Sequence, residues 1–249
     1  MKPGTKLIFA CDISDEGDGL SLIRKVSSEV DVFKIGLEAM TAENDVGQTL
    51  AYSFREKSLE LKKPVMWDMK FDDIGNTVGK ATRNIVRLGS TMFTLHASAS
   101  DAALVAAAEE SRQSDALALA VTVLTDLDDA QCRTRFLPDN TTYVGNFVAV
   151  LVENFAKNAY AKGIRGFVCS AQEARIIRQM LGADVVIVTP AIRPLWSVKA
   201  DEQKRITTPT QAVAAGADYI VVGRPISKPP LEHTEASAAR AIQEELAAA

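Results

Sequence analysis

The strongest constraint on the fold is a repeated alternation of short apolar runs with longer helical stretches. The apolar runs are rich in β-branched and aromatic residues, which favour strands. They occupy residues 7–13, 31–36, 64–70, 92–97, 118–125, 166–171, 184–192 and 219–225. Helical composition, with glycine or basic residues at several ends, predicts helices over 43–63, 75–89, 101–113, 147–163, 171–181 and the alanine-rich tail 235–249.

Eight strand–helix units in one chain predict an α/β fold, a single (β/α)₈ barrel over residues 1–249. An open, doubly wound sheet is the alternative. It is less favoured because the chain has no glycine-rich GxGxxG turn after a strand. Two connections, after Thr125 and after Ile192, are long, and both follow the carboxyl end of an expected strand, where barrel active sites lie.

Charge and cysteine usage narrow the classes of protein. With 28 basic and 32 acidic residues the net charge is -4, which gives no general attraction to nucleic acid or to an anionic membrane. No run approaches the ~20 apolar residues that span a bilayer, and the apolar run 7–11 is too short for a signal peptide. Cys11, Cys132 and Cys169 follow no metal-binding or redox spacing, which favours reduced thiols in a cytoplasmic protein.

Polar residues end almost every expected strand. On a barrel these ends meet at one face, so the residues should gather around one site. They are Asp12, Lys34, Asp68, Lys70, His96, Thr125, Ser170, Arg193, Gly223 and Arg224.

The third run, PVMWDMK, carries the most informative polar pair. Side chains alternate between the faces of a strand, so Met66, Asp68 and Lys70 should share one face and Trp67 and Met69 the other. The apolar pair should pack outward against helices. The charged pair should then point into the barrel mouth.

Burial of these charges requires mutual neutralisation. Lys34 has the parity of Val32 and Gly36, so it should face inward beside the third strand. A buried charge is costly unless paired, and carboxylates flanking a lysine favour its charged ammonium, which is suited to donating a proton. Asp72 lies beyond the strand end, and we interpret it as a solvated turn residue.

Other residues indicate an anionic ligand rather than a metal. The phosphate site of many barrels uses the loops after strands seven and eight, where Arg193 and Gly223-Arg224 lie. His96 is expected to be a hydrogen-bonded barrel residue rather than a ligand. Asp68 and Asp73 have Mg²⁺-binding chemistry, but Lys70 between them argues against a cation.

The third strand and its continuation resemble the signature of the orotidine 5'-monophosphate decarboxylase family, D-x-K-x-x-D-[IV]-[GP]-x-T. The residues that match it are Asp68, Lys70, Asp73, Ile74, Gly75 and Thr77. Further matches are collinear over nearly the whole chain. They are Asp12, FKIG with Lys34, LHAS with His96, VTVLT with Thr125, VCSAQE at 168–173, TPAIRP with Arg193, Gln203, and VVGRP with Arg224.

This resemblance implies a homodimeric barrel that decarboxylates orotidine 5'-monophosphate to uridine 5'-monophosphate without a metal or organic cofactor. It implies that Lys70 is the proton donor to C6 and that Asp68 lies beside the departing carboxylate. Lys34 and Asp73 would complete the charged array, and Asp73 and Thr77 would reach across the subunit interface.

The resemblance also implies the substrate contacts. Asp12 and Lys34 would bind ribose hydroxyls, and Thr125 would lie near the base. His96 and Ile74 are further candidates. The phosphate would be held by Arg193, Gln203, Gly223 and Arg224, with the loop after Arg193 closing over it.

Three features depart from the family pattern. Ala191 replaces the glycine of TPGIRP, the segment 126–129 is more acidic than expected over a pyrimidine, and residues 131–144 do not align with the family. Two alternatives to the decarboxylase remain at this stage. One is a Mg²⁺-dependent sugar-phosphate lyase of the 3-hexulose-6-phosphate synthase or keto-gulonate-phosphate decarboxylase type, which shares the D-x-K-x-x-D core. The other is a non-catalytic nucleotide-binding barrel.

Overall fold

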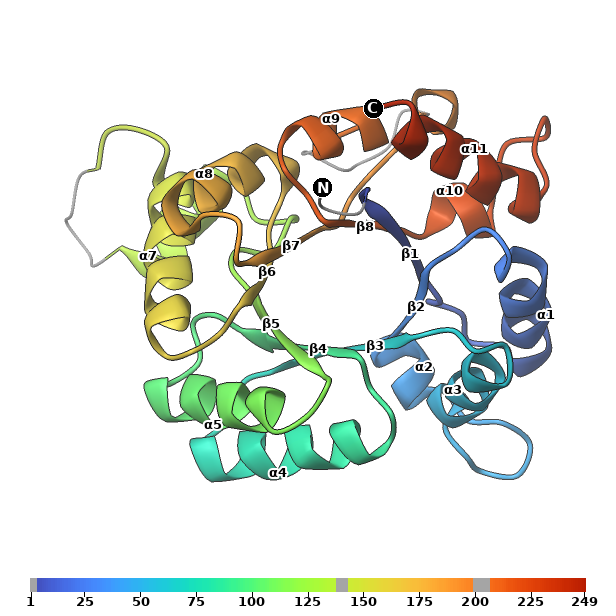
Figure 1. The fold of residues 1–249 in the computed structure, drawn as a ribbon, viewed down its shortest axis with the longest axis horizontal. Coiled ribbons are helices and arrows are strands. Elements are labelled where there is room, and N and C mark those ends of the chain that lie inside the picture. Colours follow the sequence, from blue (N-terminus) through green and yellow to red (C-terminus); the bar gives the residue numbers. More distant parts are fainter. Residues whose placement is uncertain (1–3, 138–142, 199–206) are drawn as a thin grey trace.

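The computed structural model describes residues 4–137, 143–198 and 207–249, which form a closed ring of parallel strands surrounded by helices (Figure 1). Each strand pairs with the next, and β1 pairs with β8 to close the ring. The barrel expected from the alternation is confirmed, and the open sheet is excluded. The strands are β1 Lys6–Ala10, β2 Val32–Gly36, β3 Val65–Phe71, β4 Met92–His96, β5 Leu117–Val121, β6 Gly166–Val168, β7 Val186–Thr189 and β8 Tyr219–Val222.

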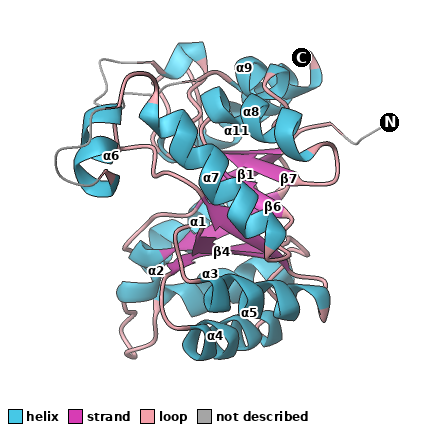
Figure 2. Cartoon of the chain, turned by 90° about the vertical axis from the view of Figure 1, so that its left-hand side faces the viewer, coloured by secondary structure: helices cyan, strands magenta, loops and turns pink. Residues whose placement is uncertain are grey.

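The helices lie outside the ring, with α6 at the periphery of the molecule (Figure 2). Within the described ranges, none has the length and apolar character needed to cross a bilayer. The tail forms α11 as predicted, and it packs on α1, α9, α10 and β1. The helices are α1 Glu16–Val26, α2 Leu37–Thr41, α3 Leu50–Glu60, α4 Gly75–Arg87, α5 Asp101–Arg112, α6 Asp129–Phe136, α7 Phe147–Ala161, α8 Ala171–Leu181, α9 Pro209–Ala214, α10 Arg224–Ser227 and α11 Glu235–Ala247.

The helix predicted over 43–63 was wrong at its start. Residues 44–48 form a turn in which the Asn44 side chain accepts hydrogen bonds from the backbone N–H groups of Val46 and Gln48, at 3.2 and 2.9 Å. Gly47 adopts a φ of 72°, which glycine tolerates and a helix does not allow. Helix α3 therefore begins at Leu50.

The long connection after Thr125 contains a helix that the sequence did not predict. Helix α6 is short and has no clear apolar stripe, so periodicity gave no signal for it. Its start is fixed by a capping box. The Asp128 side chain accepts from the Gln131 N–H, and the Gln131 side chain accepts from the Asp128 N–H, both at 2.9 Å.

Two apolar layers hold the barrel together. One fills the interior of the ring and includes Ile8, Val32 and Met66. The other lies between the strands and the helices and includes Phe33 and Trp67. The adjacent residues Met66 and Trp67 fall in different layers, which confirms the predicted facing of β3 at this point.

Among the described helices, α4 and α5 make the most extensive contact with each other. Gly75 lies at this contact, where it has no side chain to separate the two helices. A Cβ on Gly75 would lie 2.9 Å from the backbone of Ala102. Gly75 follows directly after Asp73 and Ile74, so close packing here fixes where the segment leaving β3 enters its helix.

Replacing Gly75 by alanine is expected to destabilise the protein by about 1–3 kcal/mol, because the added methyl group forces α4 away from α5. Urea-induced unfolding measures this loss. Gly79→Ala in the same helix is the matched control, since its Cβ would meet only the Ala106 methyl group at 3.4 Å. Gly79→Ala should be neutral or stabilising through its better helix propensity. Equal effects of the two variants would contradict the packing argument.

Candidate active site

Two adjoining cavities open at the carboxyl ends of the strands. The first, of about 170 Å³, is lined by Lys34, Met66, Asp68, Lys70, Val121, Val123, Leu124, Thr125, Val168, Cys169, Pro190 and Val221. The second, of about 260 Å³, is lined by Ala10, Asp12, Lys34, Thr125, Pro190, Ala191, Ile192, Arg193, Val221, Gly223, Arg224 and Pro225. Both cavities are lined by Lys34, Thr125, Pro190 and Val221. They therefore form one site with an apolar half and a cationic half.

A chain of ion pairs joins three strands at the floor of this site. Lys34 Nζ lies 2.9 Å from Asp12 Oδ1 and 3.2 Å from Asp68 Oδ2. Lys70 Nζ lies 2.8 Å from the other Asp68 oxygen, Oδ1. The Asp68 carboxylate thus bridges two ammonium groups, and together with Asp12 it balances their charge, as the sequence predicted for a buried cluster.

The backbone of β3 breaks its regular pairing where Lys70 stands. Trp67 pairs with Phe93, but Phe71 pairs with Leu95, so β3 carries extra residues relative to β4. Lys70 itself has a φ of 48°, a left-handed conformation that is unusual for lysine. The backbone at Lys70 is therefore irregular, but the predicted facing is confirmed, since Met66, Asp68 and Lys70 all line the first cavity. Strain of this kind often occurs where a side chain must be aimed.

Thr94 on β4 stabilises this bulge, and the sequence analysis missed it. Its fully buried hydroxyl accepts from the Lys70 N–H and donates to Asp68 Oδ1, both at 2.9 Å. It thereby fixes both the backbone of Lys70 and the carboxylate. The available signal was its position two residues before His96, a polar side chain in an otherwise apolar strand.

Gly36 at the end of β2 makes room for the ion pair beside it. A Cβ there would lie 3.0 Å from Lys34 Nζ and 3.3 Å from Asp12 Oδ1. The glycine of the FKIG sequence therefore serves the geometry of the charges, since its φ of -116° is open to any residue.

Within this cluster, pairing outweighs burial for the pKa values of Lys34 and Asp68. Burial by itself lowers the pKa of Lys34, but the carboxylates of Asp68 and Asp12 outweigh it and raise the pKa above its ordinary value of 10.5. Burial likewise raises the pKa of Asp68, but Lys34 and Lys70 outweigh it and lower the pKa below 3.8. Both groups are therefore charged at neutral pH.

The second cavity is cationic. Among the described residues, Lys34, Arg193 and Arg224 line it against a single carboxylate, that of Asp12. Arg193 is buried, and its backbone N–H donates to the carbonyl oxygen of Thr207 at 2.9 Å. Guanidinium groups around a cavity of this size suit a phosphate group.

An aromatic contact joins the two loops that border this cavity. The ring of Trp196, in the short 3-10 helix Leu195–Ser197 after β7, lies 4.5 Å from the ring of His233, which precedes α11. Their planes are inclined by 37°. The start of the loop after Arg193 is therefore held against the segment that follows β8.

The structure does not bring every predicted residue into the cavities. Asp73, Ile74 and Thr77 are exposed, and the Asp73 side chain accepts from the Ile74 N–H at 2.7 Å. None of the three lines either cavity. Asp72 is also exposed, in keeping with the turn interpretation. Gln203 lies outside the described residues.

His96 also lies outside the lining of both cavities. It is half-buried at the end of β4, and burial, partly opposed by Asp72, lowers its pKa. The expected hydrogen bond to its imidazole is not found among the described residues. In the same part of the chain, no group of three His, Cys, Asp or Glu side chains is arranged to hold a metal ion.

The thiols are withdrawn from the solvent. Cys11, Cys132 and Cys169 are buried, and burial, reinforced by Asp12, raises the pKa of Cys11 to about 12. A thiol with so high a pKa is a poor nucleophile. This fits the structural role that the sequence suggested.

Comparison with known proteins places this site in a family. The profile of the "Orotidine 5'-phosphate decarboxylase / HUMPS family" matches residues 5–240. Orotidine 5'-phosphate decarboxylase of Heliobacterium modesticaldum is 39% identical over 99% of this chain and 98% of its own. That of Afipia carboxidovorans is 40% identical over 99% and 97%. The crystal structure of orotidine 5'-phosphate decarboxylase from Lactobacillus acidophilus superposes with a TM-score of 0.77 at 27% identity, covering 97% of this chain and 99% of that one.

Replacing Asp68 by asparagine is expected to cost about 3–5 kcal/mol of unfolding free energy at pH 7, because the buried ammonium of Lys34 and the partly exposed ammonium of Lys70 lose their shared counter-charge. The raised pKa of Lys34 adds stability below pH 10.5 that is lost as pH rises through its folded pKa. The lowered pKa of Asp68 adds stability above pH 3.8 that is lost as pH falls through its folded pKa. The difference between parent and variant should therefore be largest between these limits.

Urea unfolding across this pH range measures the effect. Asp12→Asn is the matched control, since Asp12 also pairs with Lys34 but its side chain is 46% exposed. We expect it to cost at most about 1 kcal/mol. A loss for Asp68→Asn no greater than that for Asp12→Asn would show that the buried array does not depend on Asp68.

Ala191 offers a second test, because it occupies the family's glycine position with a φ of 62°. A left-handed alanine costs roughly 1–2 kcal/mol, and the greater freedom of glycine in the unfolded chain offsets part of this. Ala191→Gly should therefore raise the unfolding free energy by about 0.5–1 kcal/mol, measured by thermal unfolding. Lys62→Gly, at a φ of 56° after α3, should give a similar gain far from the site. Destabilisation by Ala191→Gly alone would refute the strain argument.

Proposed function

Since the chain belongs to the orotidine 5'-phosphate decarboxylase / HUMPS family, we propose that it is a carboxy-lyase in which Lys70 protonates C6 of the pyrimidine. The reaction is the decarboxylation of orotidine 5'-monophosphate to uridine 5'-monophosphate and CO₂. It is the activity for which the relatives from Heliobacterium and Afipia are named. The geometry around Lys70 supports its assignment as the proton donor.

The observation that carries the proposal is the position of one ammonium group. Lys70 lines the apolar cavity, and its Nζ is held 2.8 Å from Asp68. The cationic cavity with Arg193 and Arg224 adjoins it. A nucleotide whose phosphate occupies the cationic half has its base in the apolar half, with the ring edge toward Lys70.

The chemical step develops charge where the site is prepared for it. Cleavage of the bond between C6 and the carboxylate releases CO₂ and leaves the electron pair on C6. The ammonium of Lys70 stabilises that negative charge and transfers a proton to C6, and the neutral amine regains a proton from water. Because the lysine is already placed by Asp68 and Thr94, little reorganisation is needed at the moment of reaction.

The other charged residues position the substrate. Asp12 and Lys34 line the cationic half on the side of the charge array, where ribose hydroxyls would lie. Thr125 borders both cavities and would lie near the base. The phosphate would be bound by Arg193, Gly223 and Arg224. Binding energy gained there, far from C6, would offset the cost of ordering the pyrimidine beside Lys70.

We further propose that the protein is a homodimer in the cytoplasm. Asp73, Ile74 and Thr77 form an exposed segment directly after the charge array, and Ile74 is 67% exposed. A second copy would cover this apolar side chain and receive Asp73 and Thr77 at its own site. The buried thiols fit a reducing compartment.

Replacing Lys70 by alanine is expected to lower kcat at least about 10³-fold, because both the proton donor and the neighbouring positive charge are lost. The loss of pyrimidine absorbance after addition of orotidine 5'-monophosphate measures turnover. Uridine 5'-monophosphate should still bind, which separates lost chemistry from lost folding. Lys25→Ala, which removes an exposed lysine on α1, should leave kcat unchanged. Substantial turnover by Lys70→Ala would exclude it as the proton donor.

Pretreatment with EDTA separates this reaction from the metal-dependent alternative. Activity of the parent toward orotidine 5'-monophosphate should survive the chelator. Activity toward 3-hexulose-6-phosphate or keto-gulonate-phosphate that EDTA abolishes and Mg²⁺ restores would instead favour a sugar-phosphate lyase.

A further inference from the structure

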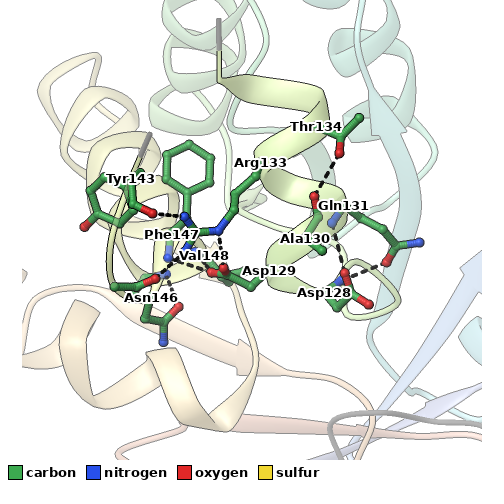
Figure 3. A network of polar contacts seen from close by, with 12 residues as sticks. Asp128, Asp129, Ala130, Gln131, Arg133, Thr134, Tyr143, Asn146, Phe147 and Val148 are labelled. Carbon is green, nitrogen blue, oxygen red and sulfur yellow. Dashed lines mark hydrogen bonds and ion pairs between the residues drawn. The ribbon is translucent and has the colours of Figure 1, made fainter. Parts of the chain in front are cut away.

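The connection between β5 and α7 contains a polar network whose hub is a single arginine, Arg133 of α6 (Figure 3). Its Nε donates to Asp129 Oδ2 at 2.5 Å. Its two terminal nitrogens donate to the backbone carbonyl oxygens of Tyr143 and Gly145. The guanidinium also lies over the aromatic rings of Tyr143 and Phe147, at 5.4 and 5.9 Å from their centroids.

Asp129 uses its second oxygen to hold the start of α7. Its Oδ1 accepts from the backbone N–H groups of Phe147 and Val148, at 2.6 and 3.2 Å (Figure 3). Asn146 accepts from the next N–H, that of Ala149, at 3.1 Å. The first turn of α7 is thus capped by two residues. One of them is a carboxylate from α6, whose negative charge interacts favourably with the positive end of the α7 dipole.

This network explains the acidic segment that departs from the family pattern. Asp128 caps α6, and Asp129 caps α7 while pairing with Arg133. Asp128 is therefore engaged in capping its own helix, and Asp129 in joining α6 to α7. In sequence, the segment follows Leu124 and Thr125, which line the cavity assigned to the base.

Among the described residues, the apolar packing of α6 is small. Of its eight residues only Cys132 is buried. At its far end Phe136 contacts Phe155 of α7, with ring centroids 5.8 Å apart. The helix that α6 contacts most is α7, and not a strand of the barrel. A helix with so small an apolar face depends on its polar contacts for its position.

We propose that the Asp129–Arg133 pair positions the base-side wall of the active site. It fixes the connection at α7, so that Leu124 and Thr125 are held between this anchor and β5 and the wall is formed before the substrate binds. Arg133 is a positioning residue that does not touch the substrate. This inference rests on the proposed function, which places the nucleobase in the apolar cavity.

Arg133→Met tests the proposal, because methionine keeps much of the apolar stem and removes every donor. The KM for orotidine 5'-monophosphate and the Kd of uridine 5'-monophosphate should rise about threefold to tenfold, the effect of losing one or two net hydrogen bonds. The Kd of ribose 5-phosphate, which has no base, should stay within twofold of the parent value. Arg133→Lys keeps the charge but loses the forked geometry, and it should fall between the parent and Arg133→Met.

Lys157→Met is the matched control on α7. It removes a charge whose partner is Glu153, on the same helix and away from α6, and it should change none of the three constants. An unchanged Kd of uridine 5'-monophosphate in Arg133→Met would overturn the proposal. So would an equal weakening of ribose 5-phosphate binding, which would indicate general loosening of the site. If Arg133→Met does not fold, the same comparison is made with Arg133→Lys.

The test remains distinct from that of the proposed function. Absence of orotidine 5'-monophosphate turnover in the parent protein would refute the function. The ratio of the affinities for uridine 5'-monophosphate and ribose 5-phosphate, compared between the parent and Arg133→Met, would still show whether Arg133 positions the base-side wall.

Discussion

The structure of the site depends on one carboxylate, that of Asp68, which binds two ammonium groups inside the barrel mouth. Burial opposes the charges of Lys34 and Asp68, so each is tolerated only because its partners are present. The alternation of sign fixes three strands relative to one another at the point where chemistry is needed. It also keeps Lys34 charged where an isolated buried lysine would lose its proton.

Around this array the chain uses backbone devices that serve position rather than stability. Lys70 adopts a left-handed backbone conformation on a bulge, and Ala191 does so beside the cationic cavity. Gly36 leaves space beside the Lys34–Asp12 pair. Such local costs are supported by a well-packed frame, here the two apolar layers of the barrel. The mobility of the wall near Leu124 is limited by contacts further along the same connection, at Asp129 and Arg133.

The barrel and the contact of Lys34 with Asp68 could be predicted from the sequence, because the first follows from periodicity and the second from the need to pair buried charges. The bulge at Lys70 and the role of Thr94 could not, since these depend on the register between β3 and β4, which no local pattern encodes. Helix α6 was missed because its signal is polar capping rather than an apolar stripe. The roles of Asp73 and Thr77 stay predictions, because they concern a second subunit.

The closure of the ring between β1 and β8 has a consequence for how the active site is built during synthesis. The residues of the charge array lie just after β1 and on β2 and β3, within the first third of the chain, and can meet before the rest is made. The cationic cavity joins Asp12, near the beginning, to Arg224, near the end, so it forms only when β8 docks against β1. Contacts this distant in sequence form late in folding. A nascent chain therefore acquires the charge array before it acquires the cationic cavity, and an incomplete chain is left with two open strand edges.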